Sequence, residues 1–407
     1  MDSEYDEEDQ AFQTEVRAFL RASAQLRPPG KRRIEVASRG DVAAAKAWQR
    51  RKADARLAGI ALPTRFGGRG GSIRQQMIYD QEELHYDVPS DFLFMIGLGH
   101  CAPTLIRESE ALAAAYLPAM IRGEEIWCQL FSEPGAGSDL AGVRVRAERD
   151  GDMWRINGQK IWTSGAHVSD RGLLLARTDP NLPRHRGLGF FVVDMHAPGV
   201  EVRPIKQMSG EWGFNEVFFD DVLIADDQRV GAPTDGWRLA VAMLADERLT
   251  VGRVLTPDVL PLLRLADRCR IGDKPAIEHA AVREKIARWY VEQRGVSHTI
   301  SRIMTALTNA DDDVPEGAII KLVDSVRDME MSDFALDLLA ETGGDGFASD
   351  DMTSAIAEYL AAPAARIAGG TEEILLNVIG ERVLGLPPEP RPDRNAPFAE
   401  GGRQSRS

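Results

Sequence analysis

The sequence predicts an α+β protein in which a block of strands separates two helical regions. Near the amino terminus, apolar residues that begin with Phe12 and Val16 recur at the spacing of one helix face. Over residues 143–148 apolar and charged residues alternate, which indicates a strand. The helical period returns near Pro233 and continues to about Val383.

The chain is too long for one hydrophobic core. At 407 residues, 43% of them apolar, it is expected to divide into several domains. After Pro387 the sequence is rich in Pro and Arg and has almost no apolar residues, which predicts a disordered tail. The predicted parts are a helical domain over 1–127, a β domain over 128–232, a helical domain over 233–386 and the tail over 387–407.

Turn and cap residues mark the borders of individual elements. Asp41 can cap a helix over 43–57, because its carboxylate can accept the unpaired N–H groups of the first turn. The glycines over 67–71 indicate a loop. Asp150-Gly151 and Asn157-Gly158 predict two hairpin turns, since these residue types tolerate a positive φ. Further strands are expected over 173–176, 189–194 and 217–224.

Composition argues against several classes of protein. A net charge of −14 disfavours a nucleic-acid partner, because phosphate binding requires clustered Lys and Arg. The three cysteines and seven histidines lack the spacing of a metal site or a disulfide framework. No apolar run of about 18 residues could span a membrane, and the acidic start is unlike a signal peptide. These features predict a cytoplasmic protein without a bound metal.

Three short segments point to an enzyme family. They are Cys128–Asp139, Asn157–Ser164 and Ala368–Thr371. Together they resemble the acyl-CoA dehydrogenase family, whose members oxidise a CoA thioester with FAD, and the resemblance extends over nearly the whole chain. It implies that family's fold: an N-terminal helical domain, a central β-barrel-like domain and a C-terminal four-helix bundle, with the flavin between the last two.

The resemblance assigns a role to residues of the first two segments. Ser132 matches a side-chain donor near flavin N1 and O2, where negative charge builds during reduction. Trp162 matches a tryptophan that stacks on the flavin, and the resemblance implies that Ser138 lies by the pantetheine chain of CoA. The positions that match cofactor contacts are Gln129, Phe131, Ser132, Ser138, Trp162, Ser164, Arg268, Gly343, Gly344, Thr371 and Glu373.

The adenine end of FAD departs from the family pattern. Arg268 keeps the charge that a pyrophosphate requires. Ile271 replaces an aromatic residue, and His279 and Ala340 stand where glutamines are usual. In the family these positions reach FAD across a subunit interface, so the departures put that contact in doubt here.

The catalytic base is expected on an unusual element. Many family members carry a Glu at the position of Gly369, whose backbone N–H also stabilises the developing enolate. Relatives of the isovaleryl- and long-chain type place the base on another helix, immediately before an Arg, and Glu247 precedes Arg248 here. Glu247 is therefore the predicted base, and Glu372 and Glu373 are interpreted as acids that complement a helix dipole. Predicted substrate contacts come from Ser138, Asp246, Arg248 and Gly370.

Three functions stay open at this point. The first is an FAD-dependent acyl-CoA dehydrogenase for a branched, long or bulky acyl-CoA, which would form the trans-2-enoyl-CoA and pass electrons to an electron-transfer flavoprotein. The second is a flavin oxidase or monooxygenase on the same fold. The third is a flavin-poor subunit that completes another chain's site. The resemblance also implies a homodimer, a homotetramer or a heterotetramer.

Overall fold

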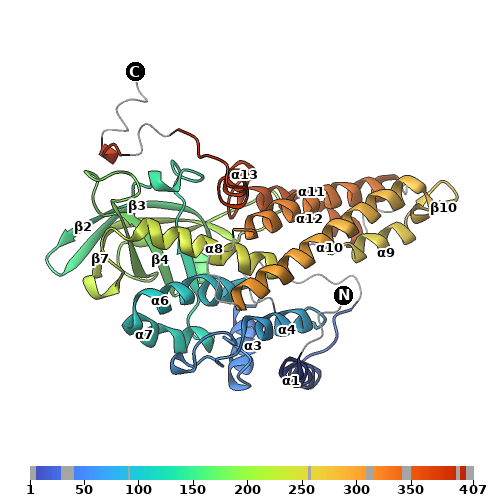
Figure 1. The fold of residues 1–407 in the computed structure, drawn as a ribbon, viewed down its shortest axis with the longest axis horizontal. Helices are drawn as coiled ribbons and strands as arrows, with labels where there is room; N and C mark the ends of the chain where they lie inside the picture. Colours follow the sequence, from blue (N-terminus) through green and yellow to red (C-terminus); the bar gives the residue numbers. More distant parts are fainter. Residues whose placement is uncertain are drawn as a thin grey trace. The chain divides into compact units, whose positions relative to one another are not determined.

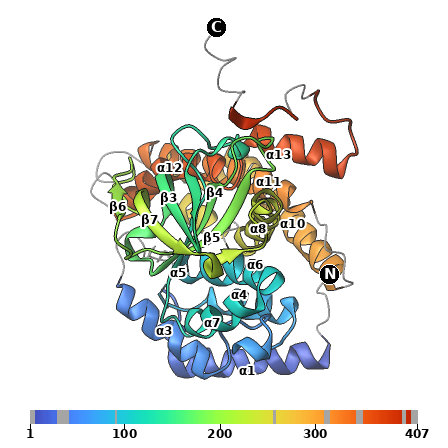
Figure 2. The same cartoon turned by 90° about the vertical axis from the view of Figure 1, so that its left-hand side faces the viewer.

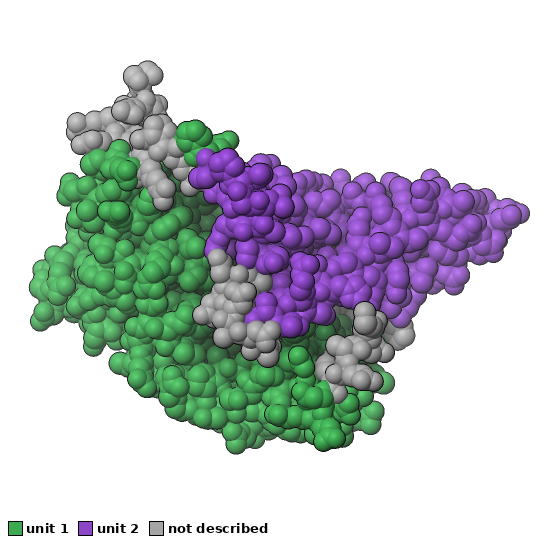
Figure 3. All heavy atoms as spheres, in the orientation of Figure 1, with its two compact units in different colours: residues 1–207, 211–247, 389–407 green, residues 208–210, 248–388 purple. Residues whose placement is uncertain are grey.

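The computed structural model divides the chain into two compact units, coloured in Figure 3. The first contains residues 1–207, 211–247 and 389–407, and the second contains 208–210 and 248–388. The predicted helical domain over 1–127 and β domain over 128–232 both belong to the first unit, because their side chains share one hydrophobic core. The structure describes residues 6–28, 41–89, 92–254, 258–308, 315–341, 350–390 and 395–399.

Helices form the amino-terminal part of the first unit, drawn in blue and cyan in Figure 1. Phe12, Val16 and Leu20 are buried on one face of α1, as their spacing predicted. The carboxylate of Asp41 accepts the N–H of Ala44 at 3.0 Å, so the predicted cap is confirmed. The elements are α1 (Glu7–Ser23), α3 (Val42–Asp54), η1 (Thr64–Phe66), α4 (Ile73–Glu83), α5 (Phe92–Met95), η2 (Ile96–Cys101), α6 (Ala102–Glu108) and α7 (Glu110–Ile121).

An eight-stranded mixed sheet follows, with the order β6-β7-β3-β2-β4-β5-β8 and β1 paired to β4. β1 runs parallel to β4, and in the described part of the chain it pairs with no other strand. One edge of β1 is therefore outside the sheet ladder. The strands are β1 (Trp127–Leu130), β2 (Arg146–Asp150), β3 (Met153–Ser164), β4 (Arg171–Arg177), β5 (Leu188–Asp194), β6 (Val200–Ile205), β7 (Phe214–Ala225) and β8 (Arg229–Val230).

Of the two predicted hairpin turns, one is correct. Gly151 has a φ of 62° and joins β2 to β3. Asn157-Gly158 is not a turn: it lies inside β3, where the pairing with β7 slips by one residue. The Asn157 side chain donates to the Asp221 carboxylate at 2.9 Å and accepts the Asp221 N–H at 3.0 Å, so it bridges this bulge. Asn and Gly therefore occur here at a bulge between two strands and not at a chain reversal.

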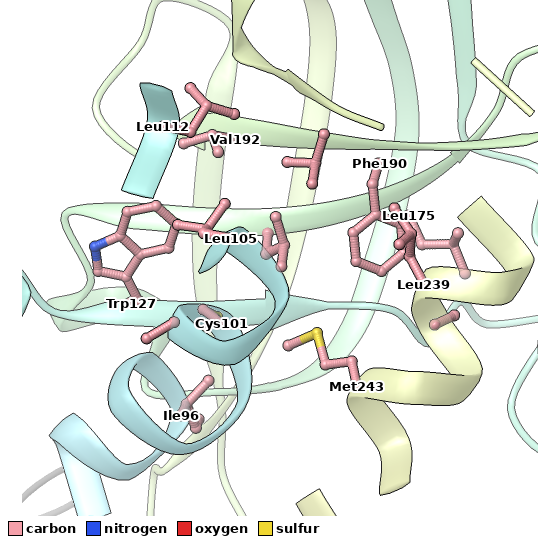
Figure 4. Packing of buried hydrophobic residues seen from close by; sticks show 14 of the residues in the cluster. Ile96, Cys101, Leu105, Leu112, Trp127, Leu175, Phe190, Val192, Leu239 and Met243 are labelled. Atoms are coloured by element: carbon pink, nitrogen blue, oxygen red, sulfur yellow. The ribbon is translucent and has the colours of Figure 1, made fainter. Parts of the chain in front are cut away.

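Helix α8 (Gly236–Val254) begins where the helical period was expected to return. Leu239 and Met243, both buried, point toward the β4 and β5 side chains Leu175 and Phe190 (Figure 4). Figure 2 shows the start of α8 running beside β5. Apolar residues one turn apart thus fix which face of α8 lies on the sheet.

Part of the predicted disordered tail has a defined place in the first unit. Within 387–407, the segment 395–399 lies on the loop between β4 and β5. The Phe398 N–H donates to the Leu182 carbonyl at 3.0 Å, and the Phe398 ring lies 3.9 Å from the Arg177 guanidinium. A cation–π contact with a buried arginine gives this aromatic residue a partner that the tail's composition did not reveal.

The second unit is helical beyond a short hairpin of β9 (Arg270–Ile271) and β10 (Lys274–Pro275). Helices α9 to α12 share one buried core, which confirms the expected four-helix bundle, and Trp289 packs on Phe334 at 5.4 Å between ring centroids. Its remaining elements are α9 (Leu260–Arg268), η6 (Ala276–Glu278), α10 (Ala280–Thr308), α11 (Gly317–Glu341), α12 (Asp350–Ile367), α13 (Glu372–Val378) and η8 (Ile379–Val383). Among the described helices, none has the length and apolarity needed to cross a bilayer.

A buried ion pair joins two amino-terminal helices. The Lys52 ammonium of α3 lies 3.7 Å from the Glu83 carboxylate of α4, and their side chains are 7% and 2% exposed. Glu83 also accepts hydrogen bonds from Trp48 at 2.9 Å and Tyr79 at 2.8 Å. Removal of the Lys52 ammonium would take a cation away from a carboxylate that is buried, which is unfavourable.

We therefore expect Lys52→Met to lower the free energy of unfolding by about 3 kcal/mol in chemical denaturation followed by circular dichroism. Lys46→Met is the control, because Lys46 is on the same helix and its pair with Asp170, at 3.4 Å, is about one-third exposed. That variant should lose less than about 1 kcal/mol. An equal loss of unfolding free energy in the two variants would contradict a special contribution of the buried Lys52–Glu83 pair to stability.

Candidate active site

The predicted base, Glu247, faces the segment Cys128–Asp139, which is called the flavin-type motif below. Glu247 lies one turn beyond Met243 on α8, so the stripe that packs on the sheet also directs Glu247 toward it. The Gln129 side-chain amide of β1 donates to Glu247 Oε2 at 3.3 Å. The structure thus brings together a carboxylate and a motif residue that are 118 positions apart in sequence.

Asp246 precedes Glu247 but has a different partner. The Arg107 guanidinium of α6 lies 2.6 Å from Asp246 Oδ2. Burial raises the pKa of Asp246 above its usual range, and the bond from Arg107 acts in the opposite direction. Because consecutive residues of a helix point in different directions, only Glu247 of these two acids faces β1. The predicted substrate contact by Asp246 stays a prediction.

The segment that follows β1 is tied to β3. The Ile161 N–H donates to the Ser132 carbonyl at 2.9 Å, which places Ser132 beside Trp162. The Phe131 side chain is buried and packs edge-on against Phe190 at 5.5 Å. The Phe131 side chain therefore belongs to the core, and the predicted backbone contact of Phe131 with the flavin stays a prediction.

Trp162 has a strained backbone and an exposed side chain. Its φ is 62°, a region that non-glycine residues rarely occupy, and the pairing of β3 with β7 slips between Lys160 and Thr163. Trp162 is 57% exposed, and its indole contacts Phe214 edge-on at 6.1 Å between ring centroids. Strain of this kind clusters at functional sites, because the surrounding structure holds it there for a purpose other than stability.

The other motif residues of the first unit lie near this region of the sheet. Ser164 is half-buried at the end of β3 and pairs with Phe214 of β7. Ser138 is exposed in the loop after Ser132. Its neighbour Asp139 forms an ion pair with Arg184 of the β4–β5 loop.

The remaining predicted site residues belong to the second unit. Gly369 and Gly370 follow α12 with φ of 66° and 107°, and Thr371 caps α13 by accepting the N–H of Ile374 at 3.4 Å. Hydrogen bonds from its own N–H and from Thr371 hold the pKa of Glu373 below its usual range. Arg248 continues α8, Arg268 is exposed at the end of α9, and Gly343 and Gly344 lie outside the described residues.

Sequence reasoning missed several polar residues of this site. The Gln129 side chain was not assigned, although its amide contacts the predicted base. Glu133 lies in the segment Cys128–Asp139 and Lys160 in Asn157–Ser164, and both are buried. The sequence alone predicted no role for either residue. Lys160 falls on the alternate positions of β3 that include the buried residues Trp154 and Ile156. A charged residue at such a position is the signal that could have identified Lys160, because an isolated buried charge is costly. No cluster of His, Cys, Asp or Glu suited to a metal occurs among the described residues.

Three family models match the chain in order. They describe the acyl-CoA dehydrogenase N-terminal domain over residues 6–124, the middle domain over 128–222 and the C-terminal domain over 234–384. The chain therefore belongs to the acyl-CoA dehydrogenase family. Members of this family are oxidoreductases that act on acyl-CoA thioesters and generally bind FAD.

Individual relatives agree with this assignment. The chain is 38% identical to acyl-CoA dehydrogenase IpdE1 of Mycobacterium tuberculosis, over 84% of this chain and 88% of that protein. It is also 38% identical to acyl-CoA dehydrogenase FadE34 of the same organism, over 79% of this chain, but it spans only 43% of FadE34. Among solved structures, the Tcur3481-Tcur3483 steroid ACAD matches with a TM-score of 0.78 and 25% identity, over 96% of this chain and all of that one.

The residues present fit a flavin. A flat ring with a polar edge needs a planar apolar surface and hydrogen-bond donors, and Trp162 supplies the first. Ser132 and Ser164 carry hydroxyl groups, and β1 has an edge outside the sheet ladder. The strained backbone at Trp162 adds a second indication that this part of the sheet is a binding site.

The positive φ of Trp162 predicts an inverted order of two variants. Trp162→Gly should have a higher free energy of unfolding than Trp162→Ala, by about 1 kcal/mol, because glycine adopts this φ without strain. At Arg155, a β3 residue without a positive φ, the Gly variant should be the less stable of the two. Chemical denaturation of the four variants measures both differences, and a less stable Gly variant at 162 would refute the strain.

Proposed function

We propose that this chain is an FAD-dependent acyl-CoA dehydrogenase that converts an acyl-CoA thioester into the trans-2-enoyl-CoA, with Glu247 as the base. The contact between Glu247 Oε2 and the Gln129 amide at 3.3 Å carries the proposal, because it joins a carboxylate to the flavin-type motif. Family membership supplies the reaction class.

Glu247 removes a proton from the α-carbon of the thioester. The Gln129 amide holds one carboxylate oxygen and so restricts the rotamers from which the acid can reach a substrate. The backbone N–H of Gly369 is proposed to donate to the thioester oxygen and stabilise the enolate that develops as the proton leaves. Ser138, Asp246, Arg248 and Gly370 remain the proposed substrate contacts.

The chemistry that FAD would supply when bound is the acceptance of the hydride from the β-carbon of the substrate. Trp162 would stack on its ring system, and Ser132, Ser164 and the backbones of Gln129 and Phe131 would meet its polar edge. Arg268, Gly343, Gly344, Thr371 and Glu373 are the remaining proposed cofactor residues. An electron-transfer flavoprotein is the proposed acceptor of the electrons.

We further propose that the acyl group is bulky and polycyclic. The sequence favoured a branched, long or bulky substrate from the position of the base alone. One structural relative is named a steroid ACAD, and this supports a polycyclic acyl-CoA over a straight chain. A panel that contains both kinds of CoA ester separates the two possibilities.

Glu247→Gln should keep FAD bound but lower the rate of flavin reduction by at least about 10³-fold, because glutamine cannot accept the α-proton. Stopped-flow loss of the flavin absorption band under anaerobic conditions, with the acyl-CoA panel, measures this rate. In the wild type the polycyclic ester is expected to react fastest.

The matched control is Glu108→Gln. Glu108 ends α6 and pairs with Arg238 of α8 at 2.7 Å, so the variant makes the same chemical change on a neighbouring contact of the same helix. It should reduce flavin at a rate within about 3-fold of the wild type. Normal reduction in Glu247→Gln would remove Glu247 from the mechanism.

A second candidate function is a subunit of a heteromeric dehydrogenase. Gly369 carries no carboxylate, and His279 and Ala340 replace the usual glutamines at the adenine end. The structural relative is named for two components, Tcur3481 and Tcur3483, which supports an assembly of two chain types. In that case a second chain would supply part of the FAD site.

The purified chain alone distinguishes the two functions. The leading proposal expects one FAD per protomer, measured from absorbance after release of the flavin, and reduction by acyl-CoA without a partner. A chain that purifies without FAD and regains it only when a second subunit is co-expressed would favour the heteromeric assembly.

A further inference from the structure

We propose that Lys160 and Glu133 are positioning residues for the cofactor. Their buried ion pair sets the orientation of the Phe131–Ser132 peptide group at the flavin. The inference rests on the proposed function, because it takes FAD as the ligand. Neither residue was among the assigned site residues, and both are in the first unit.

The charged group of Lys160 lies inside the protein. Its side chain is fully buried in β3, and its ammonium group donates to the Phe131 carbonyl and to Glu133 Oε1, each at 2.8 Å. A buried ammonium group is stable only when such acceptors replace water. The position of the Phe131 carbonyl is therefore coupled to the position of the Lys160 charge.

Glu133 connects this charge to the rest of the motif. Its carboxylate accepts the N–H groups of Arg144 at 2.6 Å and Val145 at 2.9 Å, so it closes the loop that contains Ser138. The Glu133 backbone also exchanges two hydrogen bonds with Ala136, at 2.9 and 3.0 Å. Glu133 thus holds both ends of the loop over 133–145: its backbone bonds fix the start, and its carboxylate fixes the end.

Because the peptide bond is planar, the hydrogen bond from Lys160 to the Phe131 carbonyl also orients the Ser132 N–H. In a trans peptide the carbonyl of one residue and the N–H of the next point in opposite directions. Because Lys160 holds the Phe131 carbonyl from the interior of the sheet domain, the N–H of Ser132 must point the other way. Ser132 is the residue proposed to meet the electron-rich edge of the flavin, where a fixed donor dipole is most effective.

An apolar residue at position 160 could fill the same volume without the cost of desolvation. Replacement of a buried ion pair by well-packed apolar residues is often neutral or stabilising, so stability alone does not explain this pair. An ammonium group also selects one orientation of a carbonyl, which an apolar contact does not. We infer that orientation is the property that the pair provides.

Two charged side chains act on Lys160. Burial lowers the pKa of Lys160 to about 8, Glu133 opposes this shift, and Arg177 of β4 adds to it. Arg177 donates to the carbonyls of Ala141 and Arg184, each at 2.6 Å, so it supports the far end of the same loop. As the pH rises through about 8, the native protein therefore loses the Lys160 charge while Arg177 stays charged.

The test compares Lys160→Met with Lys52→Met, which removes a buried lysine from an ion pair away from the motif. The flavin is removed from each holoenzyme, and FAD is titrated back into the apoprotein. We expect Lys160→Met to raise the Kd for FAD at least about 10-fold and to shift the visible absorption spectrum of the bound flavin. Lys52→Met should lose stability but keep its Kd within about 2-fold and its spectrum unchanged.

A pH titration of the bound flavin adds a readout that a purely structural role would not change. The wild-type flavin spectrum should change with an apparent pKa near 8, and this change should be absent in Lys160→Met. Glu133→Gln keeps the shape of the acid, so it serves if Lys160→Met does not fold, and it should also weaken FAD binding.

The outcomes separate this inference from the proposed function. A wild-type chain that binds no FAD, alone or with a partner subunit, would refute the proposed function. If the wild type binds FAD but a folded Lys160→Met, or Glu133→Gln in its place, shows an unchanged Kd and spectrum, only the positioning role fails. An equal loss of FAD affinity in Lys52→Met would also overturn it, because the effect would then reflect general stability.

Discussion

The packing of α8 on the sheet is the constraint from which the position of Glu247, the proposed base, follows. Leu239 and Met243 are buried against β4 and β5, and this contact fixes the rotation of the helix about its axis. A helix advances about 100° per residue, so a rotation of one residue would exchange the roles of neighbouring side chains. Burial of the apolar stripe thus decides that Glu247 faces β1, whereas Asp246 turns to Arg107 on α6.

The first unit holds its motif by two different kinds of contact. The apolar core shared by the helices and the sheet places β1 and α8 at a defined distance, but a hydrophobic contact is not directional. Hydrogen bonds from Lys160 and Ile161 to consecutive carbonyls then orient the Phe131 and Ser132 peptide groups. The proposed cofactor site needs both, because the core sets the location and the polar contacts set the direction of each donor.

Sequence reasoning succeeded where a local signal determines the structure. The cap at Asp41, the helix face of Phe12 and Val16, and the order of helices and strands all depend on residues close together in the chain. It was wrong at Asn157-Gly158, because a turn and a bulge use the same residue types and only pairing with β7 distinguishes them. The positive φ of Trp162 and the grip of Lys160 on Phe131 depend on partners far away in sequence, so composition could not reveal them.

Gly369 illustrates how a local backbone conformation limits the side chain that a position can carry. The residue follows α12 with a φ of 66°, a conformation that ends helices and that glycine adopts without cost. An L side chain at this φ would be strained by about 1 kcal/mol, so the proposed donor N–H of Gly369 is compatible with this backbone while a carboxylate there is less favoured. Glu247 lies within α8, where φ is ordinary and the rotation of the helix is fixed by burial. The proposed base on α8 and the proposed donor N–H of Gly369 therefore each lie on a backbone conformation that suits them.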